Sequence, residues 1–66
     1  MAFKDNLYRF RCGANLSQQE LADKCGVTRQ AINAYELGSK TPRLETLILI
    51  AKALSCTTDE LLQESK

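Results

Sequence analysis

The sequence predicts an all-α fold of five helices, on two kinds of observation. Apolar residues recur every three or four positions along most of the chain, as on the buried face of a helix, and no segment alternates as a strand does. Two Ser/Thr-x-x-Glu patterns, at residues 17–20 and 57–60, have the spacing of a capping box, in which each side chain satisfies a backbone N–H at a helix start. With 66 residues, the chain is expected to form a single domain over 1–66.

The first two helices are expected over residues 2–13 and 18–25. Asn15 follows the first helix, and asparagine tolerates the left-handed conformation that closes many helices. The second helix begins after the cap residue Ser17 and ends at Gly26, because glycine adopts positive φ without steric strain. The residues expected to be buried on these two helices are Phe3, Leu7, Phe10, Leu21, Ala22 and Cys25.

The third helix is expected over residues 29–37, after a Thr28 cap and before Gly38. Two helices joined by a short turn that contains glycine have the outline of a helix-turn-helix. The residues expected to be buried in the turn and on the third helix are Val27, Ile32 and Tyr35.

A loop that contains the only proline separates the third helix from the fourth. The fourth helix is expected over residues 44–54, with a core face made by Leu44, Leu47, Ile50, Ala51 and Leu54. The fifth begins after the Thr57 cap and continues to Gln63. We expect it to be packed against the rest by Leu61 and Leu62.

Composition argues against several classes of protein. The apolar content of 44% is ordinary for a globular domain and too high for a disordered chain. The longest apolar run, residues 47–51, is too short to span a membrane, and the first residues do not resemble a secretion signal. We therefore expect a cytoplasmic protein with no membrane segment.

The three cysteines give no sign of a disulfide framework or a metal site. Their number is odd, no two have the Cys-x-x-Cys spacing, and the chain has no histidine. We expect Cys25 and Cys56 to be small buried residues and Cys12 to be a free thiol on a polar face, with redox sensing as the lesser alternative. No metal, cofactor or small-molecule ligand is expected. The lack of histidine and of an activated Ser or Cys also argues against an enzyme.

Charge is distributed unevenly, although the net charge is only +1. Residues 1–43 contain seven Lys/Arg and four Asp/Glu, a balance of +3, whereas residues 44–66 contain two and four, a balance of −2. The basic part of the chain includes the helix-turn-helix outline. This asymmetry suits a surface that faces a polyanion.

A set of residues spread over nearly the whole chain forms a specific pattern, although each of its members alone is a weak signal. The set consists of Arg11, Leu16-Ser17-Gln18, Glu20-Leu21-Ala22, Gly26-Val27-Thr28, Ile32, Glu36, Gly38, Pro42, Leu44-Glu45-Thr46-Leu47, Ala51-Lys52-Ala53-Leu54 and Asp59-Glu60-Leu61. At these spacings the chain resembles the lambda-repressor/Cro-like, or Xre-like, helix-turn-helix family. The resemblance implies a compact five-helix domain that binds double-stranded operator DNA, usually as a dimer.

In this motif the second of the two helices lies in the DNA major groove, where its first residues meet base edges. Arginine binds guanine O6 and N7 with two hydrogen bonds, and glutamine or asparagine binds adenine N6 and N7 in the same way. Ala34 offers only a methyl group, suited to a thymine, at a position where the family often has a longer polar side chain. The expected base-contacting residues are Thr28, Arg29, Gln30, Asn33 and Ala34.

Phosphate contacts are expected on both sides of that helix. Gln18 lies at the start of the second helix, which crosses the DNA backbone in this motif and has free N–H groups in its first turn. Lys40 and Arg43 lie in the loop after the third helix, and Thr41 adds a hydroxyl. Such contacts add affinity that falls with salt, and they carry no sequence preference.

Arg11 and Glu36 match family positions that form an ion pair between the first and third helices. We therefore favour a structural role for both over a contact with DNA. Breaking one partner of a fully buried pair leaves an uncompensated charge and costs about 3–5 kcal/mol.

Three residues depart from the family pattern, namely Leu37, Leu49 and Ser55. Leu49 and the final helix are expected to form one apolar patch, which favours a homodimer. A twofold dimer spaces its recognition helices by about 34 Å, one turn of DNA. The residues expected at the dimer interface are Leu49, Cys56, Thr58 and Leu62.

The sequence therefore predicts a sequence-specific DNA-binding transcriptional regulator. We expect a repressor that binds operator DNA as a homodimer. The alternative is a protein-interaction module on the same scaffold, with a third helix indifferent to DNA and a partner bound through the side of Leu37 and Leu49.

Overall fold

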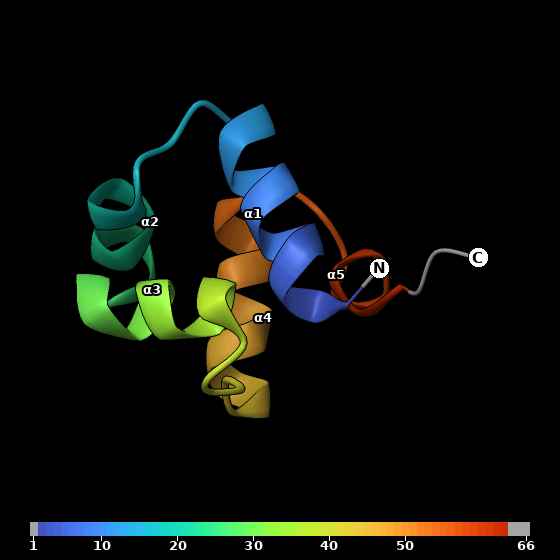
Figure 1. Ribbon diagram of the computed structural model, residues 1–66. Coiled ribbons are helices and arrows are strands. Elements are labelled where there is room, and N and C mark those ends of the chain that lie inside the picture. The colour runs from blue at the N-terminus through green and yellow to red at the C-terminus, as the bar shows by residue number, and fades with distance from the viewer. Residues whose placement is uncertain (1, 64–66) are drawn as a thin grey trace.

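Five helices follow one another along the chain, and the part described by the computed structural model, residues 2–63, contains no strand (Figure 1). The all-α prediction is therefore confirmed. The helices are α1 (Phe3–Gly13), α2 (Gln18–Cys25), α3 (Arg29–Leu37), α4 (Leu44–Ala53) and α5 (Thr58–Leu62). The fourth and fifth each end one residue earlier than expected, which is within the usual fraying of helix ends.

The predicted helix starts and stops are present as hydrogen bonds and dihedral angles. Ser17 Oγ accepts a hydrogen bond from the backbone N–H of Glu20 at 3.0 Å, and Glu20 Oε1 accepts one from the backbone N–H of Ser17 at 2.8 Å. The capping box at residues 57–60 is formed in the same way. Gly26 and Gly38 close their helices at φ values of 69° and 80°. Local chemistry therefore determines where these helices begin and end.

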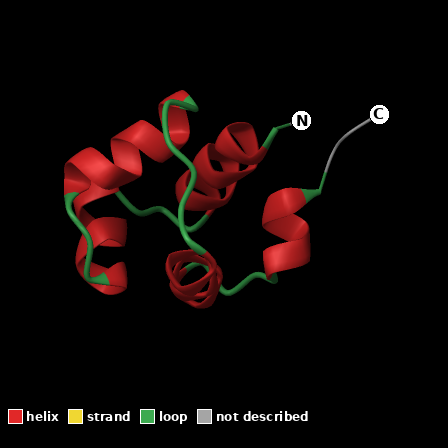
Figure 2. Cartoon of the chain, turned by 90° about the horizontal axis from the view of Figure 1, so that it is seen from below, coloured by secondary structure: helices red, strands yellow, loops and turns green. Residues whose placement is uncertain are grey.

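α2 and α3 pack against each other, and α1 packs against both α3 and α5 (Figure 1). α4 packs against α2 and α5 and completes the domain (Figure 2). As a result, α3 and α5 lie on opposite sides of α1 in Figure 1. None of the helices within residues 2–63 has the length and apolar character that a membrane crossing requires.

The core takes one large, fully buried side chain from each helix. These side chains are Leu7, Leu21, Ile32, Ile50 and Leu61. Full burial of such a side chain stabilises the fold by about 1.5–3 kcal/mol relative to exposure. The predicted buried stripes on the first four helices therefore converge on one centre, with the exception of a single residue on α4.

That exception is Leu44, which is 70% exposed rather than part of the core. It lies in the first turn of α4, which extends beyond the other helices in Figure 1, so no helix covers this end of the predicted face. The prediction that Leu62 packs against the core is also wrong, because Leu62 is 52% exposed while the adjacent Leu61 is buried. A helix of five residues turns only one side inward, and Leu61 occupies that side.

Candidate nucleic-acid interface

α3 presents one outward face along its whole length. Because 3.6 residues make a turn, positions three and four apart project on the same side. The outward face of α3 consists of Arg29, Gln30, Asn33, Ala34 and Leu37. Arg29 and Gln30 are exposed, and Leu37 is 67% exposed. Ile32, on the other side of the helix, is fully buried, so four predicted base-contacting residues share the side that α3 turns to solvent.

Thr28, the fifth predicted base-contacting residue, is the N-cap of α3. Its Oγ1 accepts a hydrogen bond from the backbone N–H of Ala31 at 3.1 Å. This bond satisfies one of the free N–H groups of the first turn. The residue is exposed, so its methyl group and its hydroxyl hydrogen remain at the surface.

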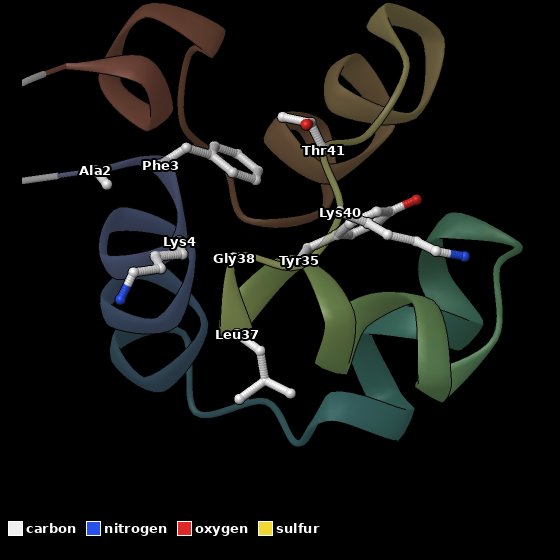
Figure 3. A pocket seen from close by; sticks show the side chains of 8 residues that line it. All are labelled: Ala2, Phe3, Lys4, Tyr35, Leu37, Gly38, Lys40 and Thr41. Carbon is white, nitrogen blue, oxygen red and sulfur yellow. The ribbon is translucent and has the colours of Figure 1, made fainter.

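The loop after α3 carries Lys40, Thr41 and Arg43, and all three are exposed. Beside it lies a shallow hollow between the start of α1 and the end of α3 (Figure 3). Lys4 and Lys40 both line the hollow, but their amines point away from each other in Figure 3. The hollow is therefore an open depression in the surface and does not bring its two cations to one point.

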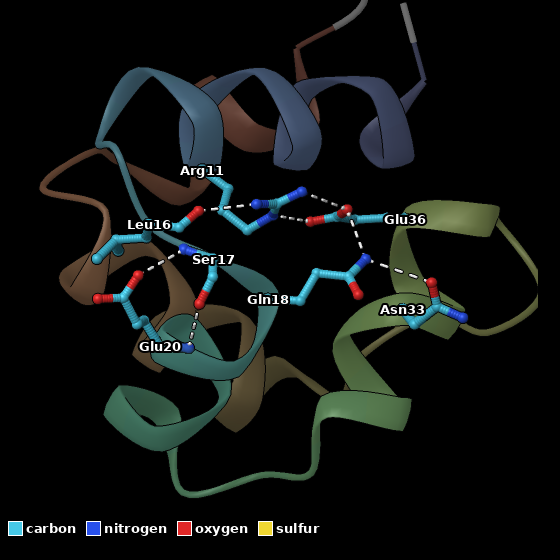
Figure 4. A network of polar contacts seen from close by, with 7 residues as sticks. All are labelled: Arg11, Leu16, Ser17, Gln18, Glu20, Asn33 and Glu36. Carbon is cyan, nitrogen blue, oxygen red and sulfur yellow. Dashed lines mark hydrogen bonds and ion pairs between the residues drawn. The ribbon is translucent and has the colours of Figure 1, made fainter.

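Arg11 and Glu36 form an ion pair between α1 and α3, with two hydrogen bonds from one guanidinium to one carboxylate (Figure 4). Arg11 Nε lies 2.5 Å from Glu36 Oε2, and Arg11 Nη2 lies 3.1 Å from Glu36 Oε1. The two side chains are only 12% and 7% exposed. Hydrogen bonding to Glu36 raises the pKa of Arg11 above its ordinary value.

The same guanidinium also donates to the turn before α2 and lies over an aromatic ring. Arg11 Nη1 donates to the backbone carbonyl of Leu16 at 2.7 Å, and the guanidinium carbon lies 5.4 Å from the centre of the Tyr8 ring. The ion pair therefore connects α1, the entry to α2 and α3 at one point.

Gln18, a predicted phosphate contact, is engaged inside the domain. Its Nε2 donates to Glu36 Oε1 at 3.1 Å and to Asn33 Oδ1 at 3.3 Å. Three of the predicted site residues outside the loop, Gln18, Asn33 and Glu36, are thereby joined (Figure 4). The bond between Gln18 and Asn33 has no signal in the sequence, because the residues are 15 positions apart on different helices.

A family model described as helix-turn-helix matches residues 7–61. The chain belongs to the lambda-repressor-like helix-turn-helix family. A crystal structure of the P22 c2 repressor protein in complex with synthetic operator 9T has the same fold, with a TM-score of 0.92 and 28% sequence identity. The match covers 98% of this chain and 98% of that one.

Related sequences are named as transcriptional regulators. The uncharacterized HTH-type transcriptional regulator YqaE of Bacillus subtilis (strain 168) is 48% identical over 61 residues, which are 92% of this chain and 53% of YqaE. The HTH-type transcriptional activator BcrR of Enterococcus faecalis is 44% identical over 62 residues, which are 94% of this chain and 30% of BcrR. The chain therefore spans about half of the first relative and less of the second.

The predicted dimer residues of this helix-turn-helix domain lie on α4, on α5 and between them. Leu49 is 45% exposed and Leu62 is 52% exposed, whereas Cys56 and Thr58 are half-buried. α5 is on the other side of α1 from α3, so a partner on α5 leaves the outward face of α3 uncovered (Figure 1).

The thiols of the helix-turn-helix domain differ in exposure. Cys12 is exposed, Cys25 is buried and Cys56 is half-buried. Burial raises the pKa of the Cys25 thiol, and burial together with the Glu60 charge raises that of Cys56. The expectation of burial therefore holds fully for Cys25 and only partly for Cys56.

Proposed function

We propose that the chain is a sequence-specific DNA-binding regulator whose α3 enters the major groove of operator DNA. The observation that carries the proposal is the outward face of α3, which offers hydrogen-bonding side chains to solvent while the opposite side is locked into the core. A helix of this kind fits the width of the major groove, and its first residues meet base edges.

Within the groove, three side chains would read bases by hydrogen bonds. Arg29 suits guanine, and Gln30 suits adenine. Asn33 lies one turn further along α3 and adds a third contact. Ala34 and the Thr28 methyl would offer apolar contact to thymine methyl groups.

Phosphates would be bound on both sides of the groove. Lys40, Thr41 and Arg43 are exposed in the loop after α3, and their side chains make no hydrogen bond within residues 2–63. On the other side, the carbonyl oxygen of Gln18 cannot bind a phosphate, so its contribution would come through the N–H groups of the first turn of α2. These contacts would supply affinity and register without sequence preference.

The proposed regulator is a cytoplasmic repressor that binds as a homodimer and has no catalytic step. Repression requires only that a bound protein occupies the DNA that a polymerase needs, whereas activation requires a further contact. The proposed dimer buries the exposed side chains of Leu49 and Leu62 against a second copy. Two copies would double the few base contacts that one α3 makes.

The test is selection of an operator from randomised DNA, followed by fluorescence anisotropy in a salt titration. We expect the selected DNA to bind more tightly than scrambled DNA at every salt concentration, with affinity falling as salt rises. Arg29→Ala should relax base preference, and Lys40→Ala should lower affinity about equally for all sequences while reducing the salt slope by about one. Failure to enrich any sequence would reject the proposal, and identical behaviour of the two variants would reject the assigned roles.

Leu37 favours a second candidate, a protein-interaction module. An apolar side chain that is 67% exposed on the outward face of α3 would suit a protein partner as well as DNA. Such a module would bind all DNA sequences alike and would lose its partner in a Leu37→Lys variant. The salt titration above separates the two candidates.

A further inference from the structure

Four side chains form a continuous chain of hydrogen bonds that ends at the outward face of α3 (Figure 4). Arg11 on α1 donates to Glu36 on α3, Gln18 on α2 donates to the same carboxylate, and Gln18 also donates to Asn33. Each link joins two different helices, so the chain is part of the packing of α1, α2 and α3.

The chemistry of the first two members determines the direction of every later bond. A guanidinium has only donors and a carboxylate has only acceptors, so Glu36 must accept from its neighbours. Gln18 lies 3.1 Å from Glu36 Oε1 and must therefore present its NH₂ group there, because its carbonyl oxygen would face another acceptor. The same NH₂ group lies 3.3 Å from Asn33, which must in turn present its carbonyl oxygen.

Asn33 is thus held with its carbonyl oxygen turned toward Gln18 and its NH₂ group turned away from the network. Its Oδ1 is occupied by Gln18, and its Nδ2 makes no hydrogen bond within the described residues. In Figure 4 this nitrogen points away from the network. Asn33 is half-buried, so its amide is held by the domain and still reaches the surface.

An amide that turns only its NH₂ group outward discriminates among bases differently from a freely rotating asparagine. A free asparagine binds adenine with two bonds, accepting from N6 and donating to N7, and this pairing needs its oxygen and nitrogen to face the base together, whereas the bond to Gln18 turns Asn33 Oδ1 toward α2. Guanine has two adjacent acceptors, N7 and O6, whereas adenine places a donor beside N7, thymine has the single acceptor O4 beside a methyl group, and cytosine presents a donor. An N–H donor is therefore satisfied best by guanine.

We infer that Asn33 reads guanine, and that Gln18 and Glu36 are positioning residues that impose this choice by turning its carbonyl oxygen away from the bases. The inference rests on the proposed function, because it needs α3 in the major groove. It also assigns Gln18 a role in specificity, in place of a direct phosphate contact by its side chain.

The experiment is operator selection with the wild-type chain and with variants at both positions. We expect a guanine whose replacement by adenine weakens binding by about 5-fold, near the lower end of the range for base-specific contacts because a single nitrogen makes this one. Replacement by inosine, which keeps N7 and O6, should leave binding unchanged. Asn33→Asp has the same shape and only acceptors, so it should abolish the preference for guanine at that position.

Gln18→Leu removes the donor that orients the Asn33 amide and should move the preference at this position from guanine to adenine. Gln19→Leu is the matched control, since Gln19 is exposed on the same helix and bonds to Asp23 instead. It should keep the wild-type preference. Far-UV circular dichroism establishes that each variant folds, and Gln18→Met replaces Gln18→Leu if that variant does not.

Three results would overturn the inference while leaving the proposed function intact. They are a wild-type preference for adenine at the position that Asn33 reads, an unchanged preference for guanine after substitution of Gln18, and an operator in which no position depends on Asn33. Enrichment of no sequence at all would instead reject the proposed function.

Discussion

Asn6 on α1 holds the end of α5 by donating from Nδ2 to the backbone carbonyl of Leu61 at 2.9 Å. A second bond runs from the same nitrogen to the carbonyl of Gln63 at 2.7 Å. Asn6 is only 7% exposed, and it is the one buried polar residue among the described part of the chain. The last carbonyls of a helix have no partner within that helix, so Asn6 supplies the donors that α5 lacks.

Asn6→Ala should therefore lower the free energy of unfolding by about 1–3 kcal/mol, because the buried carbonyl of Leu61 and the partly buried carbonyl of Gln63 lose their donor. Urea denaturation followed by circular dichroism measures this. Asn6→Asp keeps the shape and removes both donors, so it should be at least as destabilising. An Asn6→Asp variant as stable as the wild type would contradict the role of these bonds.

Removal of Glu36 or Arg11 should destabilise the domain strongly, since each leaves the other charged and nearly buried. We expect Glu36→Ala to lower the free energy of unfolding by about 3–5 kcal/mol. The exposed Lys4–Asp5 pair, with side chains 46% and 44% exposed, provides the comparison. Asp5→Asn should change stability by no more than about 1 kcal/mol. If urea denaturation gave Glu36→Ala and Asp5→Asn the same loss of stability, burial would not be what makes the Arg11–Glu36 pair important.

Gly38 and Gly26 should respond differently to alanine although both have positive φ. Either substitution places a Cβ in the left-handed region, at a cost of roughly 1–2 kcal/mol. At Gly38 the new Cβ would also lie 2.8 Å from Lys4 Cδ, whereas at Gly26 nothing lies within 4 Å. Because Lys4 is a flexible, exposed side chain that can move aside, Gly38→Ala should have a Tm only slightly below that of Gly26→Ala. Lys4→Ala should reduce the difference by removing the obstructing stem, and an unaltered difference would count against the contact.

Self-association should depend on Leu49 and Leu62 and not on every exposed leucine. Leu49→Glu and Leu62→Glu place a charge in the proposed dimer interface and should shift the chain to monomer in sedimentation equilibrium. Leu44→Glu is the control, because Leu44 is 70% exposed and lies outside that interface. A dimer that survives both interface variants, or that only Leu44→Glu disrupts, would require a different interface.

Glu20 makes the stability of the domain depend on pH. The hydrogen bond from the Ser17 backbone N–H, aided by the Ser17 hydroxyl and by Lys24, lowers the pKa of Glu20. The stabilisation is therefore complete above the unfolded-state pKa of about 4.3 and is lost as the pH falls through the lower folded-state value. Glu20→Ala should lower the Tm at pH 7, and at acid pH its difference from the wild type should shrink to the difference between Glu20→Gln and Glu20→Ala. Glu20→Gln keeps the capping bond without titrating, so its difference from Glu20→Ala should not vary with pH.

Much of the fold follows from local sequence. Capping boxes and glycines act on the backbone only a few residues away. The helix boundaries predicted from them therefore agree with the structure to within one residue. The outward face of α3 is equally predictable, because helical periodicity places its apolar and polar positions on opposite sides. Pairing of Arg11 with Glu36 came only from resemblance to a family, since no local rule joins residues 25 positions apart.

Other features required the packed helices. Leu44 has the spacing of a core residue, but only the position of the neighbouring helices decides that nothing covers it. Asn6 is buried because the end of α5 lies against α1. The periodicity of α1 alone does not predict this contact between helices.

By itself, the sequence determined the five helices, their ends and the set of side chains that α3 turns outward, because caps and periodicity act within a single helix. Only the tertiary structure decided which polar atoms of those side chains are already hydrogen-bonded within the domain and which can bind DNA. Gln18 and Asn33 come within 3.3 Å when α2 packs on α3. The direction of their hydrogen bond then follows from Arg11 and Glu36, which reach the same point from α1 and from the end of α3.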